Sequence, residues 1–379
     1  MTPVFSMHYD FFPFPLPWPS IVSPLGVAED ALSRLDERLR VSPIREGWIA
    51  RTHFIDACAS AWIDGELVHI EDLVLHDASM DIRSPTHELT RTRAVLRARR
   101  RIAREAPQWA FSASGLNALI GRAAVSEPEG QGAQGAQGEE VDAFDEDGFA
   151  PYESANDGPL TGDLAGLEAI SLRTTRLLSE LGARPPESRD PVVYDLDWDE
   201  NGRLASWREA VASTENMPSL LAAAVALLAW EEIDPLQHSA WLGRLLVSAI
   251  LRGRSRTLSH LLCVNTGLRE IARDRRRARD STTKLVALLD GFAEAARRGM
   301  KEHDRWMLAR RQLDRRLVGR RSNSSLPALA DLVVARPIVS AGLIARELKV
   351  TPRSAQDLVA VLGLREMTGR GRYRAWGIL

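Results

Sequence analysis

The chain has 379 residues, of which 45% are hydrophobic and 26% charged, and its formal net charge is −2. This composition is ordinary for a globular protein of two domains and excludes a chain that is disordered throughout. The longest strongly apolar run, Leu220 to Trp230, is too short to span a bilayer, so we expect a buried core helix and no membrane association. Cys58 and Cys263 offer neither a disulfide framework nor a metal-binding spacing, so we expect a cytoplasmic protein with no metal and no cofactor.

Charge is distributed unevenly along the chain. From Glu127 to Asp163 there are eleven acidic residues and no Lys or Arg, whereas the segment from Arg297 to the C-terminus holds eighteen Lys and Arg against seven Asp and Glu. A basic C-terminus favours a nucleic-acid partner, although an arginine-rich helix can also be a solvated face. Near the other end, a proline at every second position from 13 to 19 does not fit a helical signal sequence and predicts an extended arm.

Low-complexity and polar stretches divide the chain. The Gly- and Gln-rich residues 131–138 beside the acidic run predict a disordered insertion, and a polar stretch before Leu326 predicts a linker. We therefore expect an N-terminal arm with a helical part of the body (1–126), an acidic insertion (127–165), a helical core (166–319), a linker (320–325) and a separate small C-terminal domain (326–379).

Helical periodicity dominates the body. Apolar residues recur at helical spacing in two clear places: Phe54, Ala57, Cys58 and Ala61, and Leu285, Leu288, Leu289 and Phe292. One segment breaks the pattern, Tyr194 to Trp207, where Asn201-Gly202 is a turn signal that predicts a β-hairpin. We expect a mainly α fold.

The C-terminal domain shows the pattern of a winged helix-turn-helix. Leu326, Leu329, Ala330 and Val333 form one apolar helical face that ends before Pro337. Ser340 is the predicted N-cap of a second helix with an inward face of Ala341, Ile344, Ala345 and Leu348. Thr351-Pro352 then predicts the start of a third helix with Ala355, Leu358, Val359 and Leu362 inward. Residues 365–368 and 372–376 can pair as strands around Gly369-Arg370-Gly371 to form the wing.

Polar side chains at two places in this domain have the lengths needed to reach a duplex. The start of the third helix, which would enter the major groove, carries Thr351, Arg353, Ser354 and Gln356, with Asp357 beside them. The predicted wing would face the phosphate backbone or minor groove with Arg370, Arg372, Tyr373 and Arg374. The alternative is a winged helix that serves only protein contact or dimerisation.

A segment of the body resembles a known family. After a helix predicted from Ala222 to Ile233, residues 234–244 read Asp-Pro-Leu-Gln-His-Ser-Ala-Trp-Leu-Gly-Arg. This segment resembles the signature His-Pro-Phe-x-Asp/Glu-Gly-Asn-Gly-Arg-x-Gly-Arg of Fic-domain proteins that carry a C-terminal winged helix. The resemblance covers residues of about 48 to 319, and the order of parts matches over most of the chain. Pro235, Gly243 and Arg244 agree with the signature.

The resemblance implies that the family's chemistry is lost. Asp234 stands in place of the general-base histidine, and a carboxylate with an ordinary pKa is a poor base for a protein hydroxyl. His238 falls at or near the metal-binding acid, and Ser239-Ala240-Trp241 replaces the glycine-rich phosphate cradle. His238 could serve as a base from a shifted position, but a lone loop histidine is more often structural.

A second element of the resemblance lies near the N-terminus. Ser60, Asp64 and Gly65 resemble the inhibitory-helix pattern Ser/Thr-x-x-x-Glu-Gly/Asn, whose acid pairs with the signature's last arginine; here that pair is Asp64 with Arg244. The other interpretation, which we favour, is that Asp64-Gly65 simply ends a helix. The Asn201-Gly202 hairpin resembles the family's target-docking flap by length and position.

Because the DNA-binding features are intact and the catalytic ones are not, we expect a DNA-binding, transcriptional regulator that acts on double-stranded DNA as a homodimer, built on a catalytically inactive, Fic-like helical body. Two alternatives stay open. One is a divergent Fic-type nucleotidyl or phosphoryl transferase using ATP and Mg²⁺. The other is a toxin-antitoxin or plasmid-maintenance interaction protein that uses the acidic insertion as its contact surface.

Overall fold

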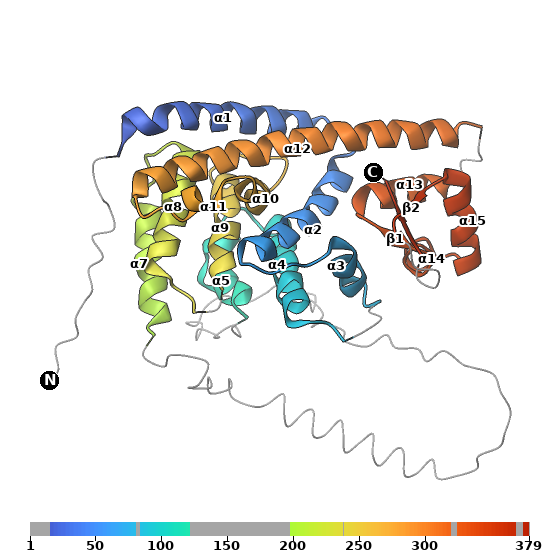
Figure 1. Cartoon of the computed structure of the whole chain (residues 1–379), viewed down its shortest axis with the longest axis horizontal. Coiled ribbons are helices and arrows are strands. Elements are labelled where there is room, and N and C mark those ends of the chain that lie inside the picture. The colour runs from blue at the N-terminus through green and yellow to red at the C-terminus, as the bar shows by residue number, and fades with distance from the viewer. Residues whose placement is uncertain are drawn as a thin grey trace, which may run out of the picture. The chain divides into compact units, whose positions relative to one another are not determined.

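Helices form the body of the protein (Figure 1). The structure is a computed structural model that describes residues 16–80, 84–121, 198–237, 239–319, 324–368 and 374–378. The N-terminal part of the body contains α1 (Trp18–Arg40), α2 (Arg45–Ile63), α3 (Ile70–Asp77), α4 (His87–Arg104), the 3-10 turn η1 (Trp109–Phe111) and α5 (Ala113–Leu119). The central part contains α7 (Glu200–Ala212), α8 (Ser219–Ile233), α9 (Ala240–Gly253), α10 (Val264–Arg269), α11 (Arg273–Arg276) and α12 (Ser281–Leu317).

The long helix α12 organises the core. Helix α1 lies along it (Figure 1) and buries a stripe at helical spacing: Ile21, Leu25, Ala28, Leu32, Leu35 and Leu39. The predicted apolar face of α12 is confirmed, since Leu285, Leu288, Leu289 and Phe292 are all buried. Helix α8, predicted as a core helix from its apolar run, is buried nearly all round and packs against α9 and α12.

Helices α8 and α9 approach closely at a glycine. A Cβ on Gly243 would lie 2.4 Å from the indole ring of Trp230, so only glycine allows this contact. The close approach fixes the angle between the two helices and the short loop, residues 234–239, that joins them. Gly243 therefore has a packing role that is independent of any signature.

Two sequence predictions are wrong in this part of the chain. Asn201-Gly202 does not form a hairpin but lies in the first turn of α7, where the Asp199 carboxylate caps the helix by accepting from the Gly202 amide at 2.9 Å. The N-terminal arm is not extended at Trp18 and Pro19, which begin α1, because proline is well tolerated in a first helical turn. The rest of the predicted arm up to residue 15, the insertion 127–165 and residues 320–323 of the linker lie outside the described residues.

The C-terminal domain has the expected helix-turn-helix with a small sheet. Its elements are α13 (Leu326–Ala335), β1 (Val339–Ser340), α14 (Ala341–Leu348), α15 (Pro352–Leu362), β2 (Arg365–Glu366) and β3 (Ala375–Gly377). The strands are antiparallel in the order β1-β3-β2, with Val339 opposite Trp376 and Glu366 opposite Trp376 on the other side. The mainly α fold with a C-terminal helix-turn-helix domain is thus confirmed.

The C-terminal domain packs closely against the body. The described residues form one compact unit in which α13 packs on α2, and α12 contacts both α13 and α15. A Cβ on Gly47 would lie 2.6 Å from Cγ1 of Val334, so the glycine lets α13 approach α2. Among the described residues, no helix is long and apolar enough to cross a membrane.

Candidate functional site

The turn between α14 and α15 is held by caps at both helix starts. The Ser340 hydroxyl accepts from the Leu343 amide at 3.2 Å, and the Thr351 hydroxyl accepts from the Ser354 amide at 3.1 Å. Lys349, with φ +54°, ends α14 in the left-handed conformation. These contacts satisfy helix-end amides and fix the direction of α15 relative to α14. Both predicted N-caps are present.

The predicted recognition helix presents a polar face to solvent. Ala355, Val359 and Leu362 of α15 are buried, whereas Thr351, Arg353, Gln356 and Asp357 are exposed and Ser354 is half-buried. Arg353 has no ion pair or hydrogen bond within the described residues, so its guanidinium is available to a ligand. Side chains of this kind at the start of a helix are suited to base edges and phosphates in the major groove.

Part of the predicted wing is described, and one of its arginines is already paired. Strands β2 and β3 cover residues 365–366 and 375–377, and residues 367, 368 and 374 lie outside the strands. Arg374 Nε donates to Glu366 Oε2 at 2.8 Å, and its guanidinium carbon lies over the Trp376 ring, 5.5 Å from the ring centroid. The Glu366 carboxylate raises the pKa of Arg374 and offsets its charge. Arg370, Arg372 and Tyr373 lie outside the described residues.

The C-terminal end of α12 carries arginines that the sequence analysis did not single out, and one of them, Arg316, contacts α15. Arg316 donates to the carbonyl of Gly363 at 3.0 Å and also to that of Leu362, at the C-terminal end of α15. Arg311 and Arg315 are exposed on the last turns of the same helix. The Arg-Arg doublets at 310–311 and 315–316 were the signal in the sequence that could have identified this basic surface.

A buried arginine joins the domain to the body. Arg51 of α2 is 8% exposed, and its guanidinium donates to the carbonyl oxygens of Val333, Arg336, Pro337 and Ile378 at 3.1 to 3.4 Å. The ring of Trp306 lies 5.0 Å from it. Burial lowers the pKa of Arg51 to about 10, so it remains charged at neutral pH. The recognition helix is therefore carried by a domain whose position is fixed by a buried cation.

The loop of the body that resembles the Fic signature is shaped mainly by helix ends. Asp234 follows α8 in the left-handed conformation with φ +46°. Pro235 is buried beside it, and His238 lies outside the described residues. No group of three or more His, Cys, Asp or Glu side chains that could hold a metal ion occurs within the described part of the chain.

The ion pair between Asp64 and Arg244 that the resemblance implied is present. Arg244 Nη2 donates to the two Asp64 carboxylate oxygens at 2.9 and 2.8 Å and to Ser60 Oγ at 3.0 Å, and Arg244 Nε donates to Asn265 Oδ1 at 2.7 Å. Asp64 also follows the last residue of α2, and Gly65 has φ +89°, so these residues end the helix as well. The guanidinium is thus engaged by three side chains.

This arrangement continues into a buried polar network that the sequence analysis missed. Asn265 donates to Asp56 at 2.9 Å, and Asp56, which is fully buried, pairs with Arg99 at 3.0 Å. Arg99 in turn donates to the carbonyl of Leu261 at 2.8 Å. The network ties α2, α4, α9 and α10 together, and because its members have partners within the protein it gives Arg244 a structural role.

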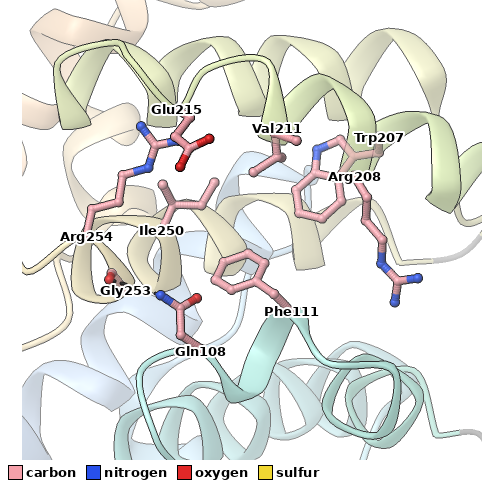
Figure 2. A pocket seen from close by; sticks show the side chains of 10 residues that line it. Gln108, Phe111, Trp207, Arg208, Val211, Glu215, Ile250, Gly253 and Arg254 are labelled. Atoms are coloured by element: carbon pink, nitrogen blue, oxygen red, sulfur yellow. Dashed lines mark hydrogen bonds between the residues drawn. The ribbon is translucent and has the colours of Figure 1, made fainter.

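A cavity of about 460 Å³ lies between α7, α9 and η1, and Figure 2 shows Phe111 facing Trp207 and Ile250 across it. Phe111 and Trp207 stack with ring centroids 6.5 Å apart. Two of its polar side chains already have protein partners: Gln108 donates to Gly253 and Arg254 to the Thr214 carbonyl. Because these two side chains already have protein partners, the cavity is a poor candidate for binding a polar ligand.

Two segments of the chain match known family models. Residues 192–318 match a family model described as a protein of unknown function (DUF1612), and residues 326–379 match a model described as an HTH DNA binding domain. A solved structure of a Fic family protein from Desulfovibrio desulfuricans G20 covers 96% of this chain and 98% of its own, with 15% identity and a TM-score of 0.44.

A curated relative is similar over nearly the whole chain. The protein recorded as "Uncharacterized protein y4cF", from Sinorhizobium fredii (strain NBRC 101917 / NGR234), is 46% identical over 381 residues, which cover 95% of this chain and 97% of the relative. The similarity includes both the helical body and the helix-turn-helix domain. The chain therefore belongs to the family of the Sinorhizobium fredii protein y4cF and carries a C-terminal HTH DNA-binding domain.

Proposed function

We propose that this protein is a sequence-specific DNA-binding regulator of transcription. The observation that carries the proposal is the exposed start of α15, where Arg353 has no partner among the described residues and lies with Thr351 and Gln356 on one polar face. The match of residues 326–379 to an HTH DNA-binding model supports the same assignment. Arg311 and Arg315 are exposed on α12, whose end contacts the C-terminal end of α15 through Arg316, and they add positive charge on that side of the domain.

We further propose that the helical body is not catalytic. Asp234 supplies a carboxylate where the family resemblance calls for a histidine base, and Arg244 is engaged by Asp64, Ser60 and Asn265. An arginine held in this way is not free to bind a phosphate without breaking those bonds. The body then acts as the support that positions the DNA-binding domain through Arg51.

Selection from a pool of randomised duplexes tests the DNA-binding proposal. The full chain is expected to enrich one sequence motif, and binding to that motif should weaken as salt rises. Failure to enrich any motif, with no salt-sensitive binding to any duplex, would remove the proposal.

Labelling with ATP and Mg²⁺ tests the second proposal separately. The full chain, alone and with a bacterial lysate, is expected to transfer no label to itself or to another protein. Transfer that the variant Arg244→Ala abolishes would show that the body is an enzyme and would contradict the non-catalytic assignment.

A further inference from the structure

A second cavity, of about 600 Å³, lies where the DNA-binding domain meets the body. Its walls come from α2, α4, the segment 258–261, Arg252 at the C-terminal end of α9, and the C-terminal end of α13. Apolar side chains such as Ile49, Phe54 and Leu332 form part of the lining. Its volume falls in the range of small-molecule sites, about 300–1,000 Å³.

The lining of this cavity is strongly basic. Five arginines contribute to it: Arg45, Arg100, Arg104, Arg252 and Arg336, against one acidic side chain, Glu46. Arg100 and Arg336 share a single carboxylate, that of Asp77, with distances of 2.8 and 3.1 Å. Arg336 also lies 3.9 Å from the Glu347 carboxylate, so these two arginines are paired with acids, and the excess positive charge of the cavity comes from its other arginines.

Of the other three arginines, Arg45 lies near an acid, with its Nε 3.6 Å from Glu46 Oε1, whereas Arg252 and Arg104 have no acidic partner among the described residues. Arg252 Nη1 donates to the carbonyls of Ile102 and Glu105, both at 2.7 Å, and burial lowers the pKa of this guanidinium. Arg45 Nε is buried without a hydrogen-bond partner, and Arg104 is exposed at the end of α4 with no ion pair in the described part of the chain. Excess positive charge in a partly enclosed space attracts anions.

Two buried histidines of the lining carry unpaired ring nitrogens. His53 Nδ1 and His260 Nε2 are both buried and without a hydrogen-bond partner. The Nδ1 atom of His260 lies 3.1 Å from the Asp36 carboxylate, which also accepts from two backbone amides. Since Asp36 is an acceptor, Nδ1 carries the proton and Nε2 is left as an acceptor that a ligand hydroxyl could satisfy.

We propose that this cavity binds a small phosphate-bearing molecule, with the arginines around Arg104 contacting the phosphate and the histidines contacting a hydroxyl-bearing part. Arginine is suited to phosphate because its planar fork of donors matches two phosphate oxygens. A bound phosphate would give an anionic partner to Arg104, which has no ion pair in the described part of the chain, and would accept from Arg45 Nε, which makes no hydrogen bond and lies 3.6 Å from the Glu46 carboxylate.

The position of the cavity connects such a ligand to the DNA-binding domain. Leu332, Ala335 and Arg336 line it from α13, while Arg45 and Arg104 line it from the body. A ligand that contacts both sides adds a link between body and domain and reduces their relative motion. The expectation that such a ligand changes DNA binding rests on the proposed function. The expectation that the ligand binds in the cavity does not depend on it.

Calorimetric titration of the full chain with pyrophosphate and with ribose 5-phosphate tests the site, with ribose as the uncharged control. At least one phosphate probe is expected to bind, and ribose is not. Arg104→Ala should weaken binding about tenfold or more, whereas Arg97→Ala, an exposed arginine on the same helix outside the lining, should leave it unchanged. Hydrogen exchange at residues 332–336 should slow when the probe is bound.

Several results would overturn the inference. The first is that neither phosphate probe binds at millimolar concentration. The second is that Arg104→Ala and Arg97→Ala change the affinity for the probe equally. The third is that a probe binds without any change in amide hydrogen exchange at residues 332–336. If Arg104→Ala weakens DNA binding and no probe binds, the arginines belong to the DNA contact surface and the small-molecule site is wrong. A chain that binds the probe but no DNA would contradict the proposed function alone.

Discussion

Arg353 is the residue that the proposed function makes most important for DNA recognition. It is exposed near the start of α15 and has no partner in the described part of the chain. Arg353→Ala is expected to weaken binding to the selected duplex by about 1–3 kcal/mol and, if the side chain reads a base, to relax the preference at that position. Fluorescence anisotropy with Arg97→Ala as the control measures this. Equal affinities of Arg353→Ala and the wild type would place the DNA contacts elsewhere.

Buried histidines make stability depend on pH. Burial, with the positive charges of Arg99 and Arg100, lowers the pKa of His53 well below 6.5, and burial also lowers that of His260 despite Asp36. The unfolded chain then binds more protons than the native one below pH 6.5, so these histidines lower stability as the pH falls through that value.

Thermal unfolding of wild type and His53→Gln at pH values of about 7.5 and about 5.5 checks this sign. The melting temperature of the wild type is expected to fall on acidification, and His53→Gln should show a smaller fall because one buried neutral histidine is gone. A larger fall in the variant would mean that His53 is charged in the native state.

Some side-chain pairings could be predicted from the sequence, and others could not. The pair of Asp64 with Arg244 was predictable only from a resemblance, because 180 positions separate the two residues. The pairing of Arg374 with Glu366 was missed, since which residues face each other across a hairpin depends on the strand register. Arg51 gave no signal, because its partners are carbonyl groups of a domain that begins after residue 325.

Among the elements, α15 depends on its N-cap. Thr351→Ala removes the hydroxyl that accepts from the Ser354 amide and should lower the free energy of unfolding by about 1 kcal/mol. Thr351→Ser keeps the hydroxyl and should lose much less. Urea denaturation of the three proteins checks the order, and equal losses in both variants would mean that the methyl group, not the cap, matters.

Element prediction succeeded where local signals agreed and failed where they competed. The helices after Ser340 and Thr351 combine an N-cap with an apolar face, and both formed as predicted. Asn201-Gly202 is a strong hairpin signal, but Asp199 three residues before Gly202 is an equally good cap, and packing of Leu204 and Trp207 in the core favours the helix.

For the whole molecule, the position of the DNA-binding domain depends on Arg51. Arg51→Met would leave four buried carbonyl contacts without a donor and should lower the free energy of unfolding by about 3 kcal/mol. Arg34→Met, at a side chain that is 69% exposed, should change it by less than about 0.5 kcal/mol. Urea denaturation gives both values, and hydrogen exchange at residues 333–337 shows whether α13 detaches. Equal stabilities would show that the domain is held by its apolar contacts alone.

The central claim is that this chain reads a DNA sequence through its C-terminal domain. The most direct measurement is the affinity of the full chain for its selected duplex and for a scrambled duplex of the same composition, as a function of salt. We expect the affinity for both to fall linearly with salt on logarithmic axes, and the selected duplex to bind tighter throughout. Equal affinity for the two duplexes at every salt concentration, or no binding to either, would contradict the claim.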